Sequence, residues 1–249
     1  MSGHSKWHNI KVKKGAADVK RGKIFTRHAK LITIAASEGG GDPSMNPSLR
    51  MAIINAKADN VPNANIEKAV QKGSGEGKDG AKFEEIMYGA FGPCGVAILI
   101  QSITDNKNRA VASIKTIVSK NGGNHAETSS IAWMFQRKGK ICVTINGKSE
   151  EESELMIIES GAEDLEKNGE EFIVTTSDTS LMNVRESLEK AGFKISNAEL
   201  THQPKNWMNV DKLEDAQKVL KFIDALEEDD DVSTVYTNCD IAEEILDQI

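Results

Sequence analysis

Residues 140–160, KICVTINGKSEEESELMIIES, join a strand to a helix, and this pairing decides how the middle of the chain folds. Two short strands around the turn Asn168-Gly169, a second helix and a final strand follow it. The expected elements are strand 140–145, helix 150–160, strands 162–167 and 171–175, helix 179–191 and strand 193–201. The order βαββαβ is the ferredoxin-like pattern. We therefore predict a ferredoxin-like α/β domain over residues 131–204.

The segments that flank this domain are each incomplete without the other. The expected elements are strands 84–91 and 96–104 and helix 106–121 before it, and helix 213–226 and strand 232–237 after it. The first segment lacks a second helix and a closing strand, and the tail of the chain supplies both. We therefore predict that residues 83–130 and 205–249 form one discontinuous α/β domain into which residues 131–204 are inserted.

Residues 1–80 predict a helical domain. Helices are expected over residues 18–37, from Pro47 to Lys57 and over 63–72, with Gly39–Pro43 ending the first and Gly73–Gly80 forming a flexible linker. One face of the first helix carries Phe25, His28, Leu31, Ile32 and Ala35, so His28 is expected to be a core histidine with a hydrogen-bond partner. The predicted fold class is α+β: a helical N-terminal domain and two α/β domains.

Composition excludes several function classes. Of the 249 residues, 39% are hydrophobic and 28% charged, as in a soluble globular protein, and no apolar run could span a membrane. Three widely spaced cysteines argue against a disulfide framework and favour a reducing cytoplasm. The glycines at 73–80 lack phosphate-loop spacing, and His4 and His8 lack further metal ligands. We therefore expect no metal, cofactor, small-molecule substrate or catalytic residues.

The charge is segregated along the chain. Residues 1–30 hold nine Lys and Arg against the single acid Asp18, whereas residues 83–249 hold 16 basic and 31 acidic residues. A basic end on an acidic body predicts that the end faces a polyanion, with lysines neutralising phosphates and Trp7 stacking on a base or sugar. The candidate nucleic-acid-binding residues are Lys6, Trp7, His8, Asn9, Lys11, Lys13, Lys14, Lys20, Arg21, Lys23, Arg27 and Lys30. We expect the acidic domains to face away from the polyanion or to contact basic ribosomal proteins.

Several motifs resemble the YebC/PmpR family over nearly the whole chain. They are Met1–Lys11 (MSGHSKWHNIK), Lys20–Thr26 (KRGKIFT), Glu38–Pro43 (EGGGDP), Asn46–Arg50, Thr104–Arg109 (TDNKNR), Ala132–Phe135 (AWMF), Ile223–Leu226 and Val235–Asn238. The resemblance implies three domains and a role in gene expression. Two positions depart from the family pattern: Cys94 replaces a usual glycine, and residues 125–130 replace a glycine-rich stretch. A negative φ is expected at Cys94 because a side chain disfavours the left-handed region.

The resemblance implies one of two functions. Bacterial members are commonly described as cytoplasmic DNA-binding transcriptional regulators, and the sequence opens on the family signature, so we expect that function and that location. The alternative is a translation factor that binds ribosomal RNA and relieves stalled elongation, since mitochondrial relatives activate translation. Neither a convincing recognition helix nor an RRM motif distinguishes the two. A third hypothesis is that the protein is an enzyme with catalytic carboxylates at a cleft between domains, but no sequence motif supports it.

Overall fold

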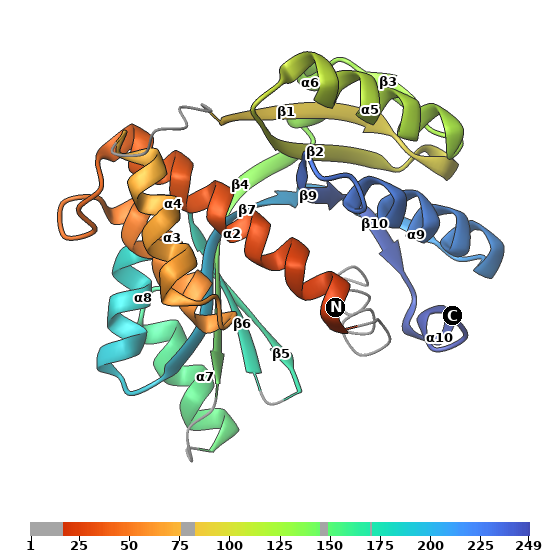
Figure 1. The fold of residues 1–249 in the computed structure, drawn as a ribbon. Helices are drawn as coiled ribbons and strands as arrows, with labels where there is room; N and C mark the ends of the chain where they lie inside the picture. The colour runs from red at the N-terminus through yellow and green to blue at the C-terminus, as the bar shows by residue number, and fades with distance from the viewer. Residues whose placement is uncertain (1–16, 76–82, 145–148, 170) are drawn as a thin grey trace.

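A computed structural model describes residues 17–75, 83–144, 149–169 and 171–249 of the chain. It combines a helical N-terminal part with two separate four-stranded sheets, each covered by helices (Figure 1). The predicted α+β class is confirmed. Within these ranges, none of the helices is long and apolar enough to cross a bilayer.

The helical part consists of α2 (Ala17–Gly39), α3 (Pro47–Ala58) and α4 (Asn63–Gly73). Ile32 of α2 and Leu49 of α3 are fully buried in its core. Asn46 joins the first two helices: its Oδ1 accepts the amide of Leu49 at 3.0 Å, and its Nδ2 donates to the carbonyl of Ala35 at 2.7 Å. Because Asn46 caps α3 while holding the end of α2, the hairpin between these helices is fixed. The last residues of the expected glycine linker, 76–80, lie outside the described ranges.

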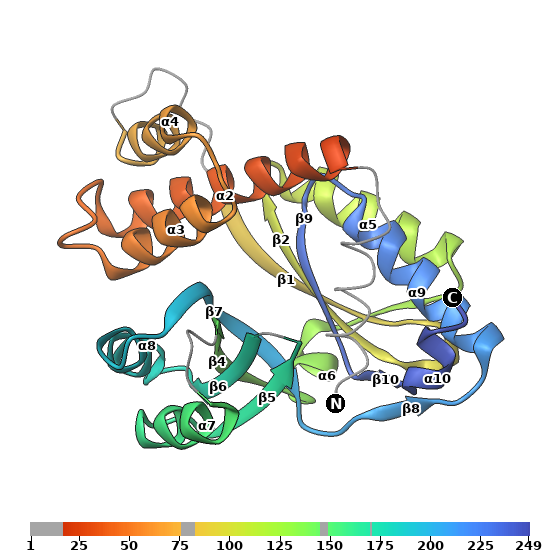
Figure 2. The same cartoon turned by 90° about the horizontal axis from the view of Figure 1, so that it is seen from below.

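The first sheet has the strand order β3-β1-β2-β9. Its strands are β1 (Glu84–Phe91), β2 (Ala97–Thr104), β3 (Asn124–Ala126) and β9 (Val232–Thr237). Helices α5 (Lys107–Lys120) and α9 (Leu213–Glu227) lie beside one another against it (Figure 2) and share one apolar core with it. Strand β9 and helix α9 therefore complete a unit that begins more than a hundred residues earlier in the chain.

The second sheet has the order β5-β6-β4-β7, with every neighbouring pair antiparallel. Its elements in chain order are β4 (Phe135–Thr144), α7 (Glu150–Glu159), β5 (Asp164–Asn168), β6 (Glu171–Ser177), α8 (Leu181–Lys190) and β7 (Lys194–Pro204). The first and third strands lie side by side at the centre of the sheet, which is the arrangement of a split βαβ unit. The ferredoxin-like pattern predicted from the sequence is confirmed.

Several short elements were not predicted. They are the strand β3, the helix α6 (Thr128–Ala132), the parallel pair β8 (Met208–Val210) and β10 (Cys239–Ile241), and the helix α10 (Glu243–Leu246). In addition, β4 begins five residues earlier than expected and β7 ends three residues later. These extensions matter because they carry the chain from one sheet to the other.

The expected negative φ at Cys94 is wrong. Cys94 lies in the 3₁₀ turn Pro93–Gly95 between β1 and β2 with φ +61°, and Gly95 follows with φ +81°. The turn thus keeps the left-handed backbone that a glycine adopts without cost, and the cysteine side chain is accommodated at the surface. The hairpin geometry, set by the pairing of Phe91 with Ala97, decides the conformation against the preference of the residue.

We predict that Cys94→Gly stabilises the protein by about 1 kcal/mol, because glycine relieves the left-handed strain of an L residue. Cys94→Ala is the control, since it removes the thiol but keeps a β-carbon, and it is expected to give no such gain. Urea unfolding followed by circular dichroism measures both. Equal stability of the two variants would contradict the strain at this turn.

Candidate nucleic-acid interface

Twelve residues carry the sequence-based prediction of a nucleic-acid interface, and five of them lie in helix α2. Lys20 and Arg21 belong to its first turns, and Lys23, Arg27 and Lys30 follow at spacings of four and three residues, which places these three on one face. The other seven lie outside the described residues: Lys6, Trp7, His8, Asn9, Lys11, Lys13 and Lys14.

Lys23 contacts the end of helix α9. Its Nζ donates to the carbonyl of Glu227 at 3.5 Å and, more closely, to the carbonyl of Glu228, the C-cap residue. The last carbonyls of a helix have no partner within it and carry partial negative charge. Lys23 therefore supplies hydrogen bonds to the last carbonyl groups of α9, although the two helices are more than two hundred residues apart in the sequence.

Arg27 joins helix α2 to both sheets. Its Nη2 donates to the hydroxyl of Thr234 on β9 at 3.1 Å and lies 3.6 Å from a carboxylate oxygen of Glu199 on β7. The Arg27 side chain is 39% exposed, so the ion pair with Glu199 adds little by itself. Its position nevertheless ties the helical part to the two α/β units at one point.

Lys30 is the most enclosed of the three cations. Its Nζ donates to the carbonyls of Ile103 at 2.9 Å and Asp230 at 2.5 Å, and lies 3.9 Å from a carboxylate oxygen of Asp231. Burial lowers the pKa of Lys30, while the charges of Asp231 and Asp230 raise it. The ammonium is thus held by acceptors of the protein itself.

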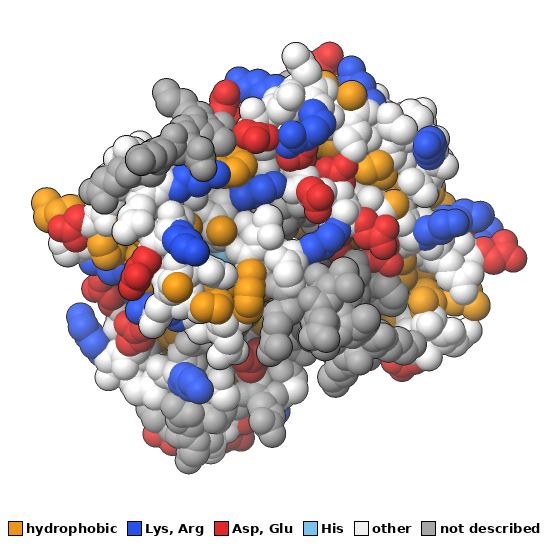
Figure 3. Space-filling model, in the orientation of Figure 1, with side chains coloured by type: hydrophobic (Ala, Val, Ile, Leu, Met, Phe, Trp, Pro, Cys, Tyr) orange, Lys and Arg blue, Asp and Glu red, His pale blue; other side chains and the backbone are white. Residues whose placement is uncertain are grey.

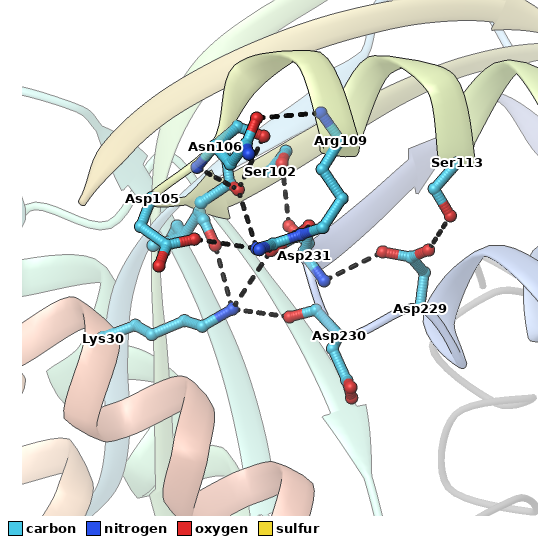
Figure 4. Close-up of polar contacts among 11 residues, drawn as sticks. Lys30, Ser102, Asp105, Asn106, Arg109, Ser113, Asp229, Asp230 and Asp231 are labelled. Atoms are coloured by element: carbon cyan, nitrogen blue, oxygen red, sulfur yellow. Dashed lines mark hydrogen bonds and ion pairs between the residues drawn. The ribbon is translucent and has the colours of Figure 1, made fainter. Parts of the chain in front are cut away.

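Arg109, at the start of α5, organises the acceptors that Lys30 uses (Figure 4). Its guanidinium holds Asp231 by two hydrogen bonds of 2.8 Å, one to each carboxylate oxygen, and reaches Asp105 at 2.8 Å. Asn106 caps α5 by accepting the amide of Arg109 at 3.0 Å. The hydrogen bonds from Arg109 hold the pKa of Asp231 below its ordinary value. The Thr104–Arg109 segment is therefore a binding motif for the turn 227–231, named the acidic turn below.

A second set of contacts docks the helical part on the ferredoxin-like unit. The amide of Asn55 on α3 donates to the carbonyl of Ala198 on β7 at 2.7 Å and accepts the amide of Ala198 at 3.2 Å. Within the helical part, His28 is buried and its Nε2 lies 2.6 Å from a carboxylate oxygen of Asp59. His28 is thus the partnered core histidine that the sequence predicted.

The basic stripe of α2 consequently faces the body of the protein. We name the contacts of Lys23, Arg27 and Lys30 with β9, β7 and the acidic turn the α2 seam. Basic and acidic side chains alternate on the face that includes it, without one continuous basic field (Figure 3). The acidic turn is the surface against which this helix lies. The expectation that the acidic domains face away from a polyanion stays a prediction.

Sequence patterns did not reveal the acidic turn as the partner of α2. Asp231 and Arg109 are 122 residues apart, and no local periodicity connects them. The available signal was the motif Thr104–Arg109, whose short polar side chains precede a helix start. Within the described ranges, no group of three or more His, Cys, Asp or Glu side chains is placed to hold a metal ion.

Comparison with known proteins shows which family matches the helical part and the two sheet-containing units. The TACO1/YebC protein N-terminal domain matches residues 5–76, and the TACO1/YebC second and third domain matches residues 83–239. This chain belongs to the TACO1/YebC family. The matched ranges meet at the linker between the helical part and β1, so the family pattern includes both sides of the α2 seam.

Individual relatives match this family member end to end. The probable transcriptional regulatory protein of Halothermothrix orenii is 47% identical over 251 residues, covering 100% of this chain and 99% of that protein. The probable transcriptional regulatory protein of Chloroherpeton thalassium is 48% identical over 250 residues, with the same coverage. The crystal structure of a conserved hypothetical protein from Aquifex aeolicus has a TM-score of 0.87 at 41% identity, covering 95% of this chain and 98% of that one.

We predict that Asp231→Asn destabilises the protein at pH 7 by about 2 kcal/mol, because hydrogen bonds to the Arg109 guanidinium lose their charged acceptor. A carboxyl whose pKa is lowered by folding adds stability above its unfolded pKa, near 4, and loses it as the pH falls through the folded value. The difference between Asp231→Asn and the parent should therefore narrow below about pH 4. Asp230→Asn is the matched control, because it removes a neighbouring carboxylate but keeps the backbone carbonyl that Lys30 binds. Urea unfolding between pH 2 and 8 measures the effect, and an equal loss in both variants would contradict it.

We also predict that the double change Lys23→Met and Lys30→Met loosens α2 from the α/β body. Removing both ammonium groups leaves the carbonyls of Glu228, Ile103 and Asp230 without these donors. Amide hydrogen exchange in α2 should accelerate about tenfold or more. Lys57→Met with Lys68→Met on the exposed faces of α3 and α4 is the control, and equal exchange in the two proteins would refute the docking role.

Proposed function

We propose that this protein is a nucleic-acid-binding regulator of gene expression, and that it acts on DNA as a transcriptional regulator in the cytoplasm. The observation that carries the proposal is the concentration of nine Lys and Arg against one acid in residues 1–30 of a chain with a net charge of −7. Relatives named probable transcriptional regulatory protein support it. We propose no catalytic activity.

The α2 seam divides the proposed interface into two parts with different tasks. Lys23, Arg27 and Lys30 donate to acceptors of the α/β body and position the helix. The phosphate contacts then fall to the cations that precede them, from Lys6 to Arg21. In this proposal, Trp7 adds stacking and Asn9 a base-edge or sugar contact.

Ribosomal RNA is the alternative target, and one observation favours it. Helices α2 and α3 both turn polar side chains onto the α/β body, through Lys30 and Asn55. A helix covered on this face cannot offer the same face to the major groove of DNA, which is how most helical readers obtain sequence specificity. A translation factor that binds backbone phosphates and unpaired bases needs no free recognition helix. Contacts between the acidic domains and basic ribosomal proteins belong to this alternative.

We predict that Lys13→Glu with Lys14→Glu weakens nucleic-acid binding and leaves the fold intact. Each lost phosphate contact should reduce the magnitude of the slope of log affinity against log salt concentration by about one. The slope of the double variant should therefore be smaller than that of the parent by about two. The control is Lys115→Glu with Lys120→Glu, the same charge change at exposed positions of α5. Fluorescence anisotropy with a 30-base-pair DNA between 50 and 200 mM salt measures both.

With six to ten phosphate contacts, the affinity of the parent protein should fall about 10³–10⁵-fold across this range of salt. A flat salt response, or equal weakening by the α5 control, would overturn the proposed interface. Lys23 and Arg27 are left unchanged here because their reversal would also disrupt the docking of α2.

Ultraviolet crosslinking in cells, with DNA and RNA fragments sequenced in parallel, separates the two targets. Fragments concentrated at promoters are the outcome expected for a transcriptional regulator. Fragments concentrated in ribosomal RNA would replace that reading with the translation factor.

A further inference from the structure

Two tryptophans lie exposed where the chain crosses between its two sheets. Trp133 is 61% exposed and Trp207 is 40% exposed, although tryptophan is mostly buried in folded proteins. Trp133 is the C-cap of α6 and lies two residues before the start of β4, the strand that leads into the ferredoxin-like sheet. Trp207 follows β7, the strand that leads back out of it. We name these crossings, residues 128–137 and 200–208, the neck.

A backbone hydrogen bond joins the two chain segments that carry the tryptophans. Phe135 pairs with Pro204 at the end of the β4–β7 ladder, and the amide of Lys205 donates to the carbonyl of Met134 at 2.8 Å. Trp133 is one residue before Met134 and Trp207 two residues after Lys205, so the two tryptophans flank this hydrogen bond on the two chain segments that it joins.

Trp133 is not part of the apolar core beside it. Phe135 is buried in an apolar cluster with Leu99 and Ile131, and the neighbouring Met134 packs against that cluster. The backbone thus directs Met134 and Phe135 inward and leaves Trp133 at the surface. Two exposed indoles on chain segments that are joined by a backbone hydrogen bond are a candidate binding surface.

The charge of the neck differs from that of the surrounding body. Residues 83–249 carry 31 acidic and 16 basic side chains, yet the neck contains no Asp or Glu. It does contain Arg137 and Lys205, both exposed, and Arg137 pairs across the ladder with His202. Glu127 and Glu199 border the neck in the sequence, and the charge of Glu85 acts on His202 within it. The aromatic and cationic groups of the neck itself are those that suit a nucleic acid, whereas a basic protein partner would favour the more acidic surfaces elsewhere.

We propose that Trp133 and Trp207 form a stacking platform for the unpaired bases of single-stranded nucleic acid, with Lys205 and Arg137 facing its phosphates. The proposal rests on the proposed function and adds a second contact surface, on the α/β body, to the N-terminal one. Indole faces stack on any base, so the platform accepts single strands of differing sequence. Paired bases are already stacked in a duplex and cannot use it.

The test compares a labelled single-stranded 12-nucleotide oligouridylate with a 12-base-pair RNA duplex. Trp133→Ala with Trp207→Ala should weaken binding of the single strand about tenfold or more and leave duplex binding unchanged. Trp133→Phe with Trp207→Phe keeps aromatic faces and should restore most of the affinity. Leu155→Ala with Ile158→Ala on α7 removes exposed apolar groups of 58% and 55% exposure elsewhere, and should change neither affinity.

The outcomes separate the two proposals. Undiminished binding of the single strand by a folded double-alanine variant overturns the platform and leaves the proposed function standing. An equal loss for single strand and duplex also overturns the platform, because stacking on unpaired bases would not weaken the duplex. A parent protein that binds neither probe overturns the platform, and one that also fails to bind the 30-base-pair DNA overturns the proposed function as well.

Discussion

The two-pronged hydrogen bond between Arg109 and Asp231 is the interaction on which the arrangement of the domains depends. Both carboxylate oxygens of Asp231 are held at 2.8 Å by one guanidinium, and the backbone carbonyl of Asp231 accepts the hydroxyl of Ser102 at 2.8 Å. This geometry fixes the acidic turn against β2 and the start of α5. The acidic turn then places the backbone carbonyl of Asp230 where it accepts a hydrogen bond from Lys30 of α2. The position of the basic helix is therefore set by a pair that lies entirely within the first α/β unit.

This dependence explains why a periodic row of cations on a helix is not by itself a nucleic-acid surface. Carbonyl groups at the end of a helix and phosphates attract the same ammonium groups, since both present oxygen atoms with negative charge. Lys23 and Lys30 make several hydrogen bonds to backbone oxygens of the protein, and these bonds are lost if the helix turns outward. The cations upstream on the chain are free of that role in the proposal, and they carry its prediction of salt dependence.

The order of helices and strands followed from the sequence because each element has a local pattern of apolar residues. The βαββαβ order of the ferredoxin-like unit, and helix α9 with strand β9, lie close to their predicted bounds. The short strands β3, β8 and β10 have three residues each, too few for any periodicity. The α2 seam was missed for another reason: Lys23 and Glu228 are 205 residues apart, and a stripe of lysines looks the same whether it faces water or a distant helix end. Cys94 shows the reverse error, since local preference predicted a φ that the hairpin overrides.

The seam also bears on how a protein of net charge −7 could approach a polyanion. At physiological ionic strength a charge is screened beyond about 8 Å, so the local balance matters more than the total. Asp231 in the acidic turn lies 3.9 Å from Lys30 of α2, and Arg109 and Lys30 together neutralise its charge. Docking of α2 therefore offsets the negative charge of Asp231. The neck contains no acidic residue of its own, and Glu127 and Glu199 border it in the sequence. The balance of charge is local at both surfaces: ion pairing offsets a carboxylate at the α2 seam, and the charged residues of the neck are Arg137 and Lys205.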